Sequence, residues 1–336
     1  MMPPCYSFRM KYDFVGIGDV TMDCFIRLHQ AEVHCKINNA DCEICMPFGT
    51  KIPYESATEV PATGNSSNAA LCVAKLGLSS ALVTSVGGDD YGKKILASLE
   101  SRNVATEYVS VHQDVQTNYY YILQYGAERT ILVKHQPFPK TLPTFAEPPH
   151  WLYFSSAGDA EFQNVVGRYC IENHVKLAFQ PNTEQIKMPL DTLKDVYAAS
   201  EIFFCNKEEA QSILKMPGEL NVKKLMEGIR ALGPKIVVVT DGPQGANVLD
   251  DSGAFHIPMY PDPAPPVSRT GAGDTTASTT VAYIFKGLEP KEALMRGMIN
   301  AASGVQAIHA QLGVMDAAGV EAWYAKRPAD FVATAL

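Results

Sequence analysis

Short apolar segments alternate along the chain with longer segments in which hydrophobic residues recur every three or four positions. The short segments are rich in β-branched and aromatic residues, and they are apolar throughout, which is typical of strands buried on both faces of a parallel sheet. We therefore expect a mostly parallel sheet with crossover helices. The predicted strands lie at residues 12–20, 81–86, 151–156, 176–180, 201–205 and 235–240.

Helical spacing follows most of these strands, and glycine and proline residues separate the segments. This order predicts an α/β protein, and a chain of 336 residues is long enough for one large domain or two smaller ones. The helices are expected at about residues 66–77, 91–103, 160–173, 206–215, 221–232, 273–287 and 290–310.

Two segments depart from this alternation. Residues 24–62 contain no long helical pattern, and residues 117–135 alternate apolar and polar side chains around the turn YGAER, as a hairpin exposed on one face does. We expect a small β lid, built from about 24–62 and 115–137, over the carboxyl edge of the sheet, where α/β folds bind ligands. Because such a sheet has open edges, we also expect two lids to pair in a homodimer.

The composition excludes several partners. A formal charge of -8 provides no basic field for nucleic acid or anionic lipid, so neither is expected as a partner. The chain has no run of 18 apolar residues and no apolar leader at its start, so we expect a cytoplasmic protein whose eight cysteines are mostly reduced.

Two phosphate-binding motifs are nearly present, and we reject both. GGDDYGKK has the glycine spacing of a P-loop, but Lys94 stands where the motif needs a Ser or Thr hydroxyl for Mg²⁺. GIGDVT has two of the three glycines of a dinucleotide-binding turn, with Thr21 in the place of the third.

A third motif, TGAGDT at residues 270–275, precedes a long apolar helix. A helix that begins here aims the backbone amides of Gly271, Ala272 and Gly273 at one point, which creates an anion hole beside Asp274. Asp274 can then accept a proton from an attacking hydroxyl during phosphoryl transfer. The alternative is that Asp274 only caps the helix.

Five fragments in this order resemble the ribokinase-like, PfkB-type family of carbohydrate kinases. They are TGNSSNAALCVAKLG (63–77), VGGDDYG (86–92), NKEEA (206–210), VTDGPQGA (239–246) and TGAGDT (270–275). The resemblance spans nearly the whole chain. It implies one domain over residues 1–336, with a three-layer α/β/α fold, a mostly parallel central sheet and a β lid.

The resemblance also implies a role for each matching residue. Asp274 would be the catalytic base, and Gly271, Ala272 and Gly273 the anion hole. Glu209 would organise Mg²⁺ through water. The substrate would be bound by Asp23, Gly64, Asn65 and Asn68, and the nucleotide by Asn206, Thr240, Gly242, Gly245 and Asn300.

Each of these roles has a structural alternative. Asn206 and Glu209 can cap a helix together, and Gly242 and Gly245 can serve a hairpin turn. Asn300 can be a satisfied amide in the core. Asp19 follows the first strand as Asp23 does, and we favour Asp23 for the substrate.

Some positions depart from the family pattern. Ser268 and Arg269 replace an Asp-Thr pair that helps hold a monovalent cation in many members, which leaves potassium activation in doubt. Thr63 replaces a glycine beside the substrate. Gln180 stands near a position that is often Asp or Asn, where it could alter a contact to phosphate or metal-bound water.

HCKINNADCEIC, in the first lid segment, is not required by the family. Cys35, Cys42, Cys45 and His34 have the ligand types of a zinc site, but adjacent His34 and Cys35 would point to opposite faces of a strand. We favour three reduced thiols over zinc.

The resulting hypothesis is an ATP-dependent kinase that uses Mg²⁺ and phosphorylates a hydroxyl of a small sugar or nucleoside. The alternative is a catalytically weak regulatory protein that binds a small molecule or nucleotide in the same pocket. The sequence does not choose the sugar or nucleoside.

Overall fold

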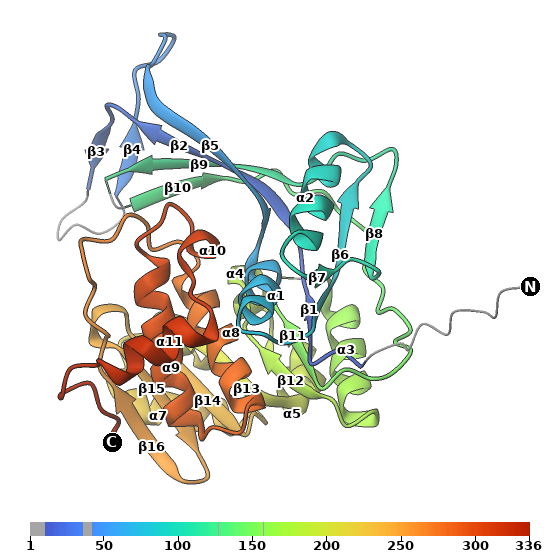
Figure 1. Ribbon diagram of the computed structural model, residues 1–336, viewed down its shortest axis with the longest axis vertical. Helices are drawn as coiled ribbons and strands as arrows, with labels where there is room; N and C mark the ends of the chain where they lie inside the picture. The colour runs from blue at the N-terminus through green and yellow to red at the C-terminus, as the bar shows by residue number, and fades with distance from the viewer. Residues whose placement is uncertain (1–10, 36–41, 127, 157) are drawn as a thin grey trace, which may run out of the picture.

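The computed structural model describes residues 11–35, 42–126, 128–156 and 158–336. A large central sheet forms the body of the molecule, and a smaller sheet projects above it (Figure 1). Within the described ranges, no helix is long and apolar enough to cross a membrane.

The central sheet contains 11 strands in the order β17-β16-β15-β14-β13-β12-β11-β1-β6-β7, and β8 also pairs with β6. The pairings from β14 through β1 to β6, β7 and β8 are parallel, whereas β15, β16 and β17 add antiparallel strands at one edge. The strands are β1 (Phe14–Ile17), β6 (Ser80–Gly87), β7 (Val104–Ala105), β8 (Val109–His112), β11 (Trp151–Phe154), β12 (Lys176–Phe179), β13 (Ser200–Asn206), β14 (Ile236–Thr240), β15 (Ala246–Asp250), β16 (Gly253–Ile257) and β17 (Thr334–Ala335).

Helices cover both faces of this sheet, because its strands are apolar on both sides. Phe14 packs into a core with α1 (Asn65–Lys75), α2 (Asp90–Glu100), α8 (Ala272–Phe285), α9 (Pro290–Gly304) and α11 (Ala317–Ala325). The next residue, Val15, packs into the opposite core. That core contains α3 (Ala160–Glu172), α5 (Lys194–Ala199), α6 (Lys207–Leu214) and α7 (Val222–Arg230).

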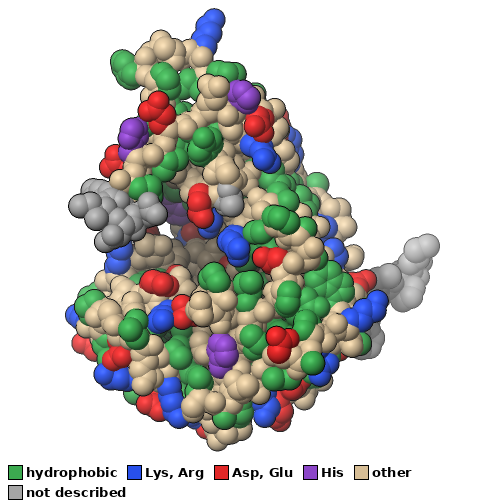
Figure 2. Space-filling view, turned by 90° about the vertical axis from the view of Figure 1, so that its left-hand side faces the viewer, with side chains coloured by type: hydrophobic (Ala, Val, Ile, Leu, Met, Phe, Trp, Pro, Cys, Tyr) green, Lys and Arg blue, Asp and Glu red, His purple; other side chains and the backbone are tan. Residues whose placement is uncertain are grey.

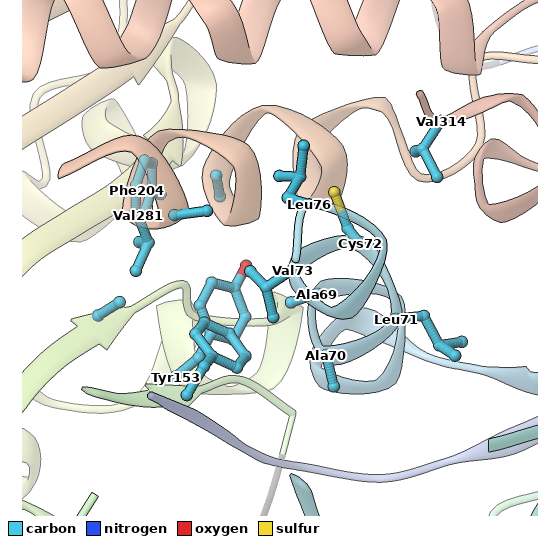
Figure 3. Packing of buried hydrophobic residues seen from close by; sticks show 14 of the residues in the cluster. Ala69, Ala70, Leu71, Cys72, Val73, Leu76, Tyr153, Phe204, Val281 and Val314 are labelled. Atoms are coloured by element: carbon cyan, nitrogen blue, oxygen red, sulfur yellow. The ribbon is translucent and has the colours of Figure 1, made fainter. Parts of the chain in front are cut away.

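Tight packing of α1 against α8 brings together residues that are distant in the sequence. Figure 3 shows Tyr153 of β11 beside Val73 of α1, with Val281 of α8 near by, and all three are buried. Small side chains such as Ala69 and Ala70 line the buried face of α1, which lets the two helices approach closely. α8 is therefore packed against both α1 and the central sheet.

The smaller sheet is the predicted lid. Its order is β10-β9-β2-β5, formed by β2 (Thr21–Leu28), β5 (Tyr54–Thr63), β9 (Tyr119–Tyr125) and β10 (Glu128–Leu132). The strands β9 and β10 form the antiparallel hairpin expected around the YGAER turn, of which Ala127 lies outside the described residues. Two short strands, β3 (Glu32–His34) and β4 (Glu43–Cys45), pair separately.

The expected three-layer fold is confirmed, and three details of the prediction need correction. β2 begins at Thr21, so the lid starts before residue 24, where it was expected, and it includes Asp23. The helix expected at 290–310 ends at Gly304, and a separate short helix, α10 (Ala310–Gly313), follows. The pattern also missed two short helices, α4 (Thr183–Lys187) and α5, together with α11.

Candidate active site

A cavity of about 1160 Å³ lies between the lid and the body. Figure 2 shows a hollow on this side of the molecule, with acidic and basic side chains around it. The cavity is lined from the lid by Asp23 and Arg129, and from the body by Asn68, Gly271 and Asp274. Residues from both ends of the chain therefore meet in one site.

The N-terminus of α8 forms part of the cavity wall. Gly271 caps this helix with a φ of 81°, a left-handed conformation that favours glycine. Gly271 and Gly273 line the cavity, whereas the amide of Ala272 donates to the carbonyl of Arg269 at 3.3 Å. The predicted anion hole thus has two of its three residues on the cavity. The hydroxyl of Thr270 is also on this wall, and it has no hydrogen-bond partner among the described residues.

Asp274 follows in the first turn of α8, and its side chain does not cap the helix. Instead, Oδ2 accepts a hydrogen bond of 2.7 Å from Nδ2 of Asn68, and Oδ1 accepts one of 3.2 Å from Nε2 of Gln180. The capping alternative considered for Asp274 is therefore wrong. The carboxylate is buried apart from the face that borders the cavity.

Burial raises the pKa of Asp274 to about 6, and it does so against three opposing effects. The hydrogen bonds from Asn68 and Gln180 favour the ionised form, as does the positive charge of Arg129 on β10. A carboxylate with a pKa near 6 accepts a proton readily at neutral pH and is still ionised there. Asp274 therefore has the properties of a general base.

Asp23 faces the same cavity from the lid. Its Oδ1 accepts a hydrogen bond of 2.6 Å from the hydroxyl of Thr21, which also lies 2.6 Å from the hydroxyl of Thr63. Burial raises the pKa of Asp23, while the two threonine hydroxyls act in the opposite direction. Asp19 also lines the cavity, but Lys140 forms an ion pair with it. Among the described residues, Asp19 forms an ion pair with a lysine and Asp23 does not.

Gly64 and Asn65 join the lid to α1 beside these carboxylates. Gly64 has a φ of 109°, and a Cβ atom here would lie 2.4 Å from the carbonyl oxygen of Asp19, so the close approach requires glycine. Asn65 donates to the hydroxyl of Ser155 at 3.2 Å. Both residues line the cavity, as the substrate prediction requires.

Four of the five residues predicted for the nucleotide lie at neighbouring strand ends, outside the lining of this cavity. Asn206 ends β13 and pairs in register with Thr240, which ends β14. Gly242 and Gly245 follow in the turn before β15, where Gly245 has a φ of 95°. These four residues therefore share one edge of the sheet.

Asn206 and Glu209 form a capping box at the start of α6. The backbone amide of Glu209 donates to Oδ1 of Asn206 at 2.8 Å, and the backbone amide of Asn206 donates to Oε2 of Glu209 at 2.8 Å. Burial raises the pKa of Glu209, and the charges of Glu208 and Asp274 raise it further. Glu209 is thus close enough to Asp274 for the two carboxylates to repel each other.

Asn300 lies in the core. Its side chain has no exposed surface, and it donates to the hydroxyl of Thr279 at 2.9 Å and accepts from the backbone amide of Met315 at 2.7 Å. These bonds match the structural alternative of a satisfied core amide, so we do not carry the nucleotide role of Asn300 forward.

The cysteine prediction is wrong for two residues. Cys35 and Cys42 form a disulfide, with their Cα atoms 4.0 Å apart, whereas Cys45 is a free thiol. The thiolates that a zinc site would need are therefore not available at Cys35 and Cys42. Residues 36–41 between them lie outside the described residues.

Sequence reasoning missed several residues on or beside the cavity. Arg129 and His309 line it, and Gln311 lies behind Asn68. Burial and the charges of two arginines lower the pKa of His309 to about 4, so this side chain is neutral at pH 7. Arg129 follows the turn of the lid hairpin, so its position relative to the lid could have suggested a role. Nothing in the local sequence marks His309 or Gln311.

Comparison with known proteins identifies the family. The family model for the pfkB family carbohydrate kinases matches residues 34–317. The chain belongs to this family. As a PfkB-family member it is a phosphotransferase with an alcohol group as acceptor.

Curated relatives of this PfkB-family protein include kinases for different acceptors. It is 26% identical over 238 residues to the ribokinase of Bacillus subtilis strain 168, an alignment that covers 69% of this chain and 76% of the relative. It is also 26% identical over 242 residues to a nucleoside kinase of Methanothermobacter thermautotrophicus, covering 68% of this chain and 73% of that protein.

Solved structures share the fold. The Arabidopsis thaliana ribokinase in complex with ribose and ATP has a TM-score of 0.78 and 19% identity, covering 93% of this chain and 98% of the other. The nucleoside kinase of Methanocaldococcus jannaschii has a TM-score of 0.76 and 18% identity, covering 94% and 99%. Both comparisons confirm a ribokinase-like fold over nearly the whole chain.

Proposed function

We propose that this protein is an ATP-dependent kinase that transfers the γ-phosphate to a hydroxyl of a small sugar or nucleoside, with Asp274 as general base. The buried carboxylate of Asp274, with a pKa of about 6 at the N-terminus of α8, is the observation that carries the proposal. ATP is proposed as donor because a ribokinase of the same fold binds ribose and ATP together.

In the reaction, the acceptor hydroxyl gives its proton to Asp274 as its oxygen attacks the γ-phosphorus. A new O–P bond forms while the bond to the β,γ-bridging oxygen breaks, and ADP leaves with that electron pair. The positive end of α8, the amides of Gly271 and Gly273, and the unpartnered hydroxyl of Thr270 would face the transferred phosphoryl group.

Asp23, Gly64, Asn65 and Asn68 would bind the acceptor. Asp23 can accept hydrogen bonds from sugar hydroxyls, because it is buried on the cavity and has no lysine partner in the described part of the chain. The cavity lining also includes the apolar residues Ile131, Val133, Phe138, Leu142 and Phe162. Apolar side chains favour an acceptor whose sugar carries a flat or apolar group, which supports a nucleoside over a free sugar.

Asn206, Thr240, Gly242 and Gly245 are proposed for the nucleotide. They meet at neighbouring strand ends, and the glycines lie where the backbone can approach a ligand closely. Lys207, which forms an ion pair of 2.9 Å with Asp241, is a further cation at this edge.

Glu209 is the proposed residue for Mg²⁺, although the described residues contain no group of three or more His, Cys, Asp or Glu side chains that could hold a metal. A buried carboxylate whose pKa is raised by another carboxylate is stabilised by a nearby cation, and Mg²⁺ prefers oxygen ligands. We propose that Glu209 holds the ion through water. When bound, Mg²⁺ would neutralise charge on the phosphates. A monovalent cation is not part of the proposal, because Ser268 and Arg269 replace the family's Asp-Thr.

A panel of sugars and nucleosides in a coupled ADP-release assay tests this function. Asp274→Asn keeps the size of the side chain but cannot accept the proton, so kcat should fall by about two to four orders of magnitude. A protein that binds ATP and acceptors without ADP release would support the alternative of a catalytically weak binding or regulatory protein. Near-normal kcat in Asp274→Asn would contradict the mechanism.

A further inference from the structure

Each oxygen of the Asp274 carboxylate accepts a hydrogen bond from a primary amide, and each amide is itself held by another donor. On one side, Nε2 of Gln180 donates to Oδ1 of Asp274, and Oε1 of Gln180 accepts from the hydroxyl of Tyr153. Burial keeps the pKa of Tyr153 well above its usual value, so its hydroxyl remains a donor. Gln180 therefore has one orientation.

The second side is a longer series of hydrogen bonds. Nδ2 of Asn68 donates to Oδ2 of Asp274 at 2.7 Å, and Oδ1 of Asn68 accepts from Nε2 of Gln311 at 2.7 Å. Oε1 of Gln311 in turn accepts from Nη1 of Arg102 at 2.8 Å. Arg102 follows α2, Gln311 lies in α10, Asn68 in α1 and Asp274 in α8.

The groups at the two ends of the series determine which atom donates and which accepts at every hydrogen bond between them. Arg102 can only donate, so the oxygen of the Gln311 amide must face it, and the nitrogen must face Asn68. The carbonyl of Ala62, which can only accept, takes a second bond of 2.6 Å from the same nitrogen and requires the same orientation. Asn68 must then turn its own nitrogen toward Asp274.

We propose that Gln311, oriented by Arg102, is a positioning residue of the kinase. It directs the amide nitrogen of Asn68 at Asp274 and so favours the ionised base. The inference rests on the proposed role of Asp274 as general base. Gln311 is 8% exposed and Asn68 is 9% exposed, so water competes little for these bonds, and bonds to an ionised group in such surroundings are strong.

Other charged and titratable groups also face Asp274. Arg129 on β10 favours the carboxylate, and the charge of Glu209 on α6 opposes it. Burial raises the pKa values of Cys72 on α1 and Tyr153 on β11, so both are neutral at pH 7. None of these four groups is a hydrogen-bond partner of the Gln311 side chain among the described residues. His309 on the cavity accepts from the backbone amide of Gln311 and is neutral at pH 7, so a variant of the Gln311 side chain keeps that bond. A shift in the pKa of Asp274 is therefore attributable to the series.

Gln311→Glu gives the most direct test of the positioning role. The new carboxylate keeps its contact with Arg102, whose charge offsets its own, but it turns an acceptor toward Asn68 and Ala62. Asn68 then rotates and presents its oxygen to Asp274. The acidic limb of the pH profile of kcat should therefore move to a higher pH by about one unit, which is a tenfold change in the proton affinity of Asp274. Carbon-13 NMR of the Asp carboxyl groups, assigned by difference from Asp274→Asn, measures the same pKa without activity.

Two further variants separate positioning from loss of stability. Gln311→Met is neutral and makes no clash with the carbonyl of Ala62, so it should fold, and it should shift the limb in the same direction by roughly half a unit. Asn164→Asp is the control. Its amide donates to the carbonyl of Thr192 at 2.9 Å, and Asn164 is not among the residues that line the cavity, so this variant should lower the melting temperature and leave the pH profile unchanged.

These experiments separate the proposed kinase function from the proposed role of Gln311. A wild-type protein whose activity does not depend on Asp274 would remove the proposed function, whereas the NMR titration would still report on the series. The positioning role of Gln311 would be overturned if the pKa of Asp274 in Gln311→Met equalled the wild-type pKa. The same holds for Gln311→Glu if that variant folds. A fall in kcat with an unmoved pKa would overturn it as well.

Discussion

Nδ2 of Asn68 lies 2.7 Å from Oδ2 of Asp274, although the two residues are 206 positions apart in the chain. The contact joins the first turn of α8 to α1, the helix that follows the lid. A residue predicted to bind substrate thus also contacts the proposed base. In the proposed mechanism, acceptor binding and proton transfer therefore depend on the same helix packing.

The pH dependence of kcat should reflect Asp274. Because burial raises its pKa to about 6, the carboxylate is ionised above that pH and protonated below it. Turnover should therefore be constant near pH 8 and decline tenfold per unit well below pH 6. Initial rates at saturating substrates give the profile. A limb that lies near pH 4 would assign the base to a carboxyl group with an ordinary pKa.

Asp23→Ala should raise the KM of the acceptor far more than the KM of ATP, since Asp23 lies on the lid side of the cavity. Asp19→Ala is the matched comparison. The carboxylate of Asp19 already has Lys140 as its partner, so its loss should affect the acceptor less. Equal losses for both substrates in Asp23→Ala, or a larger acceptor effect in Asp19→Ala, would reverse the assignment.

Glu209→Gln should raise the Mg²⁺ concentration needed for half-maximal activity by about ten- to a hundredfold, the usual effect of altering an outer partner of a metal. Glutamine can still complete the capping box of α6, so the helix should remain folded. Glu208→Gln, which changes the neighbouring exposed carboxylate, serves as the control. An unchanged Mg²⁺ dependence in Glu209→Gln would exclude the metal role.

The lid is predicted to form a homodimer, because β10 and β5 are open edges and exposed apolar residues such as Leu132 lie on β10. Light scattering at micromolar concentration should give twice the chain mass. Leu132→Lys should favour the monomer, and Leu220→Lys, at an exposed leucine outside the lid, should not. A monomeric wild-type protein would refute the prediction.

Local patterns predicted most of the fold, because the buried strands and amphipathic helices each carry their own periodicity. The helix boundaries at Gly304 and Ala310 were missed, since the apolar pattern continues across the break. The short helix α5 was missed because six residues are too few for a clear period.

Two motifs marked Gly64 and Asp274, which line one cavity, whereas the motif residues predicted for the nucleotide lie outside its lining. Sequence could not decide whether Asn300 faces a ligand or the core, because both settings suit an amide. Spacing alone also could not show that Cys35 and Cys42 meet as a disulfide. Gln311 has no motif, and its importance arises only from contacts across the fold.

The contacts of Asp274 have a consequence for the order of folding. Its partners come from α1, from the end of β12 and, through Gln311, from α10, so the contacts span most of the chain. Contacts between distant segments form late, because closing long loops costs entropy before it is compensated. During synthesis the N-terminal strands emerge first and can pair before α8 exists. We therefore expect the contacts of Asp274 to form near the end of folding, after most secondary structure has formed.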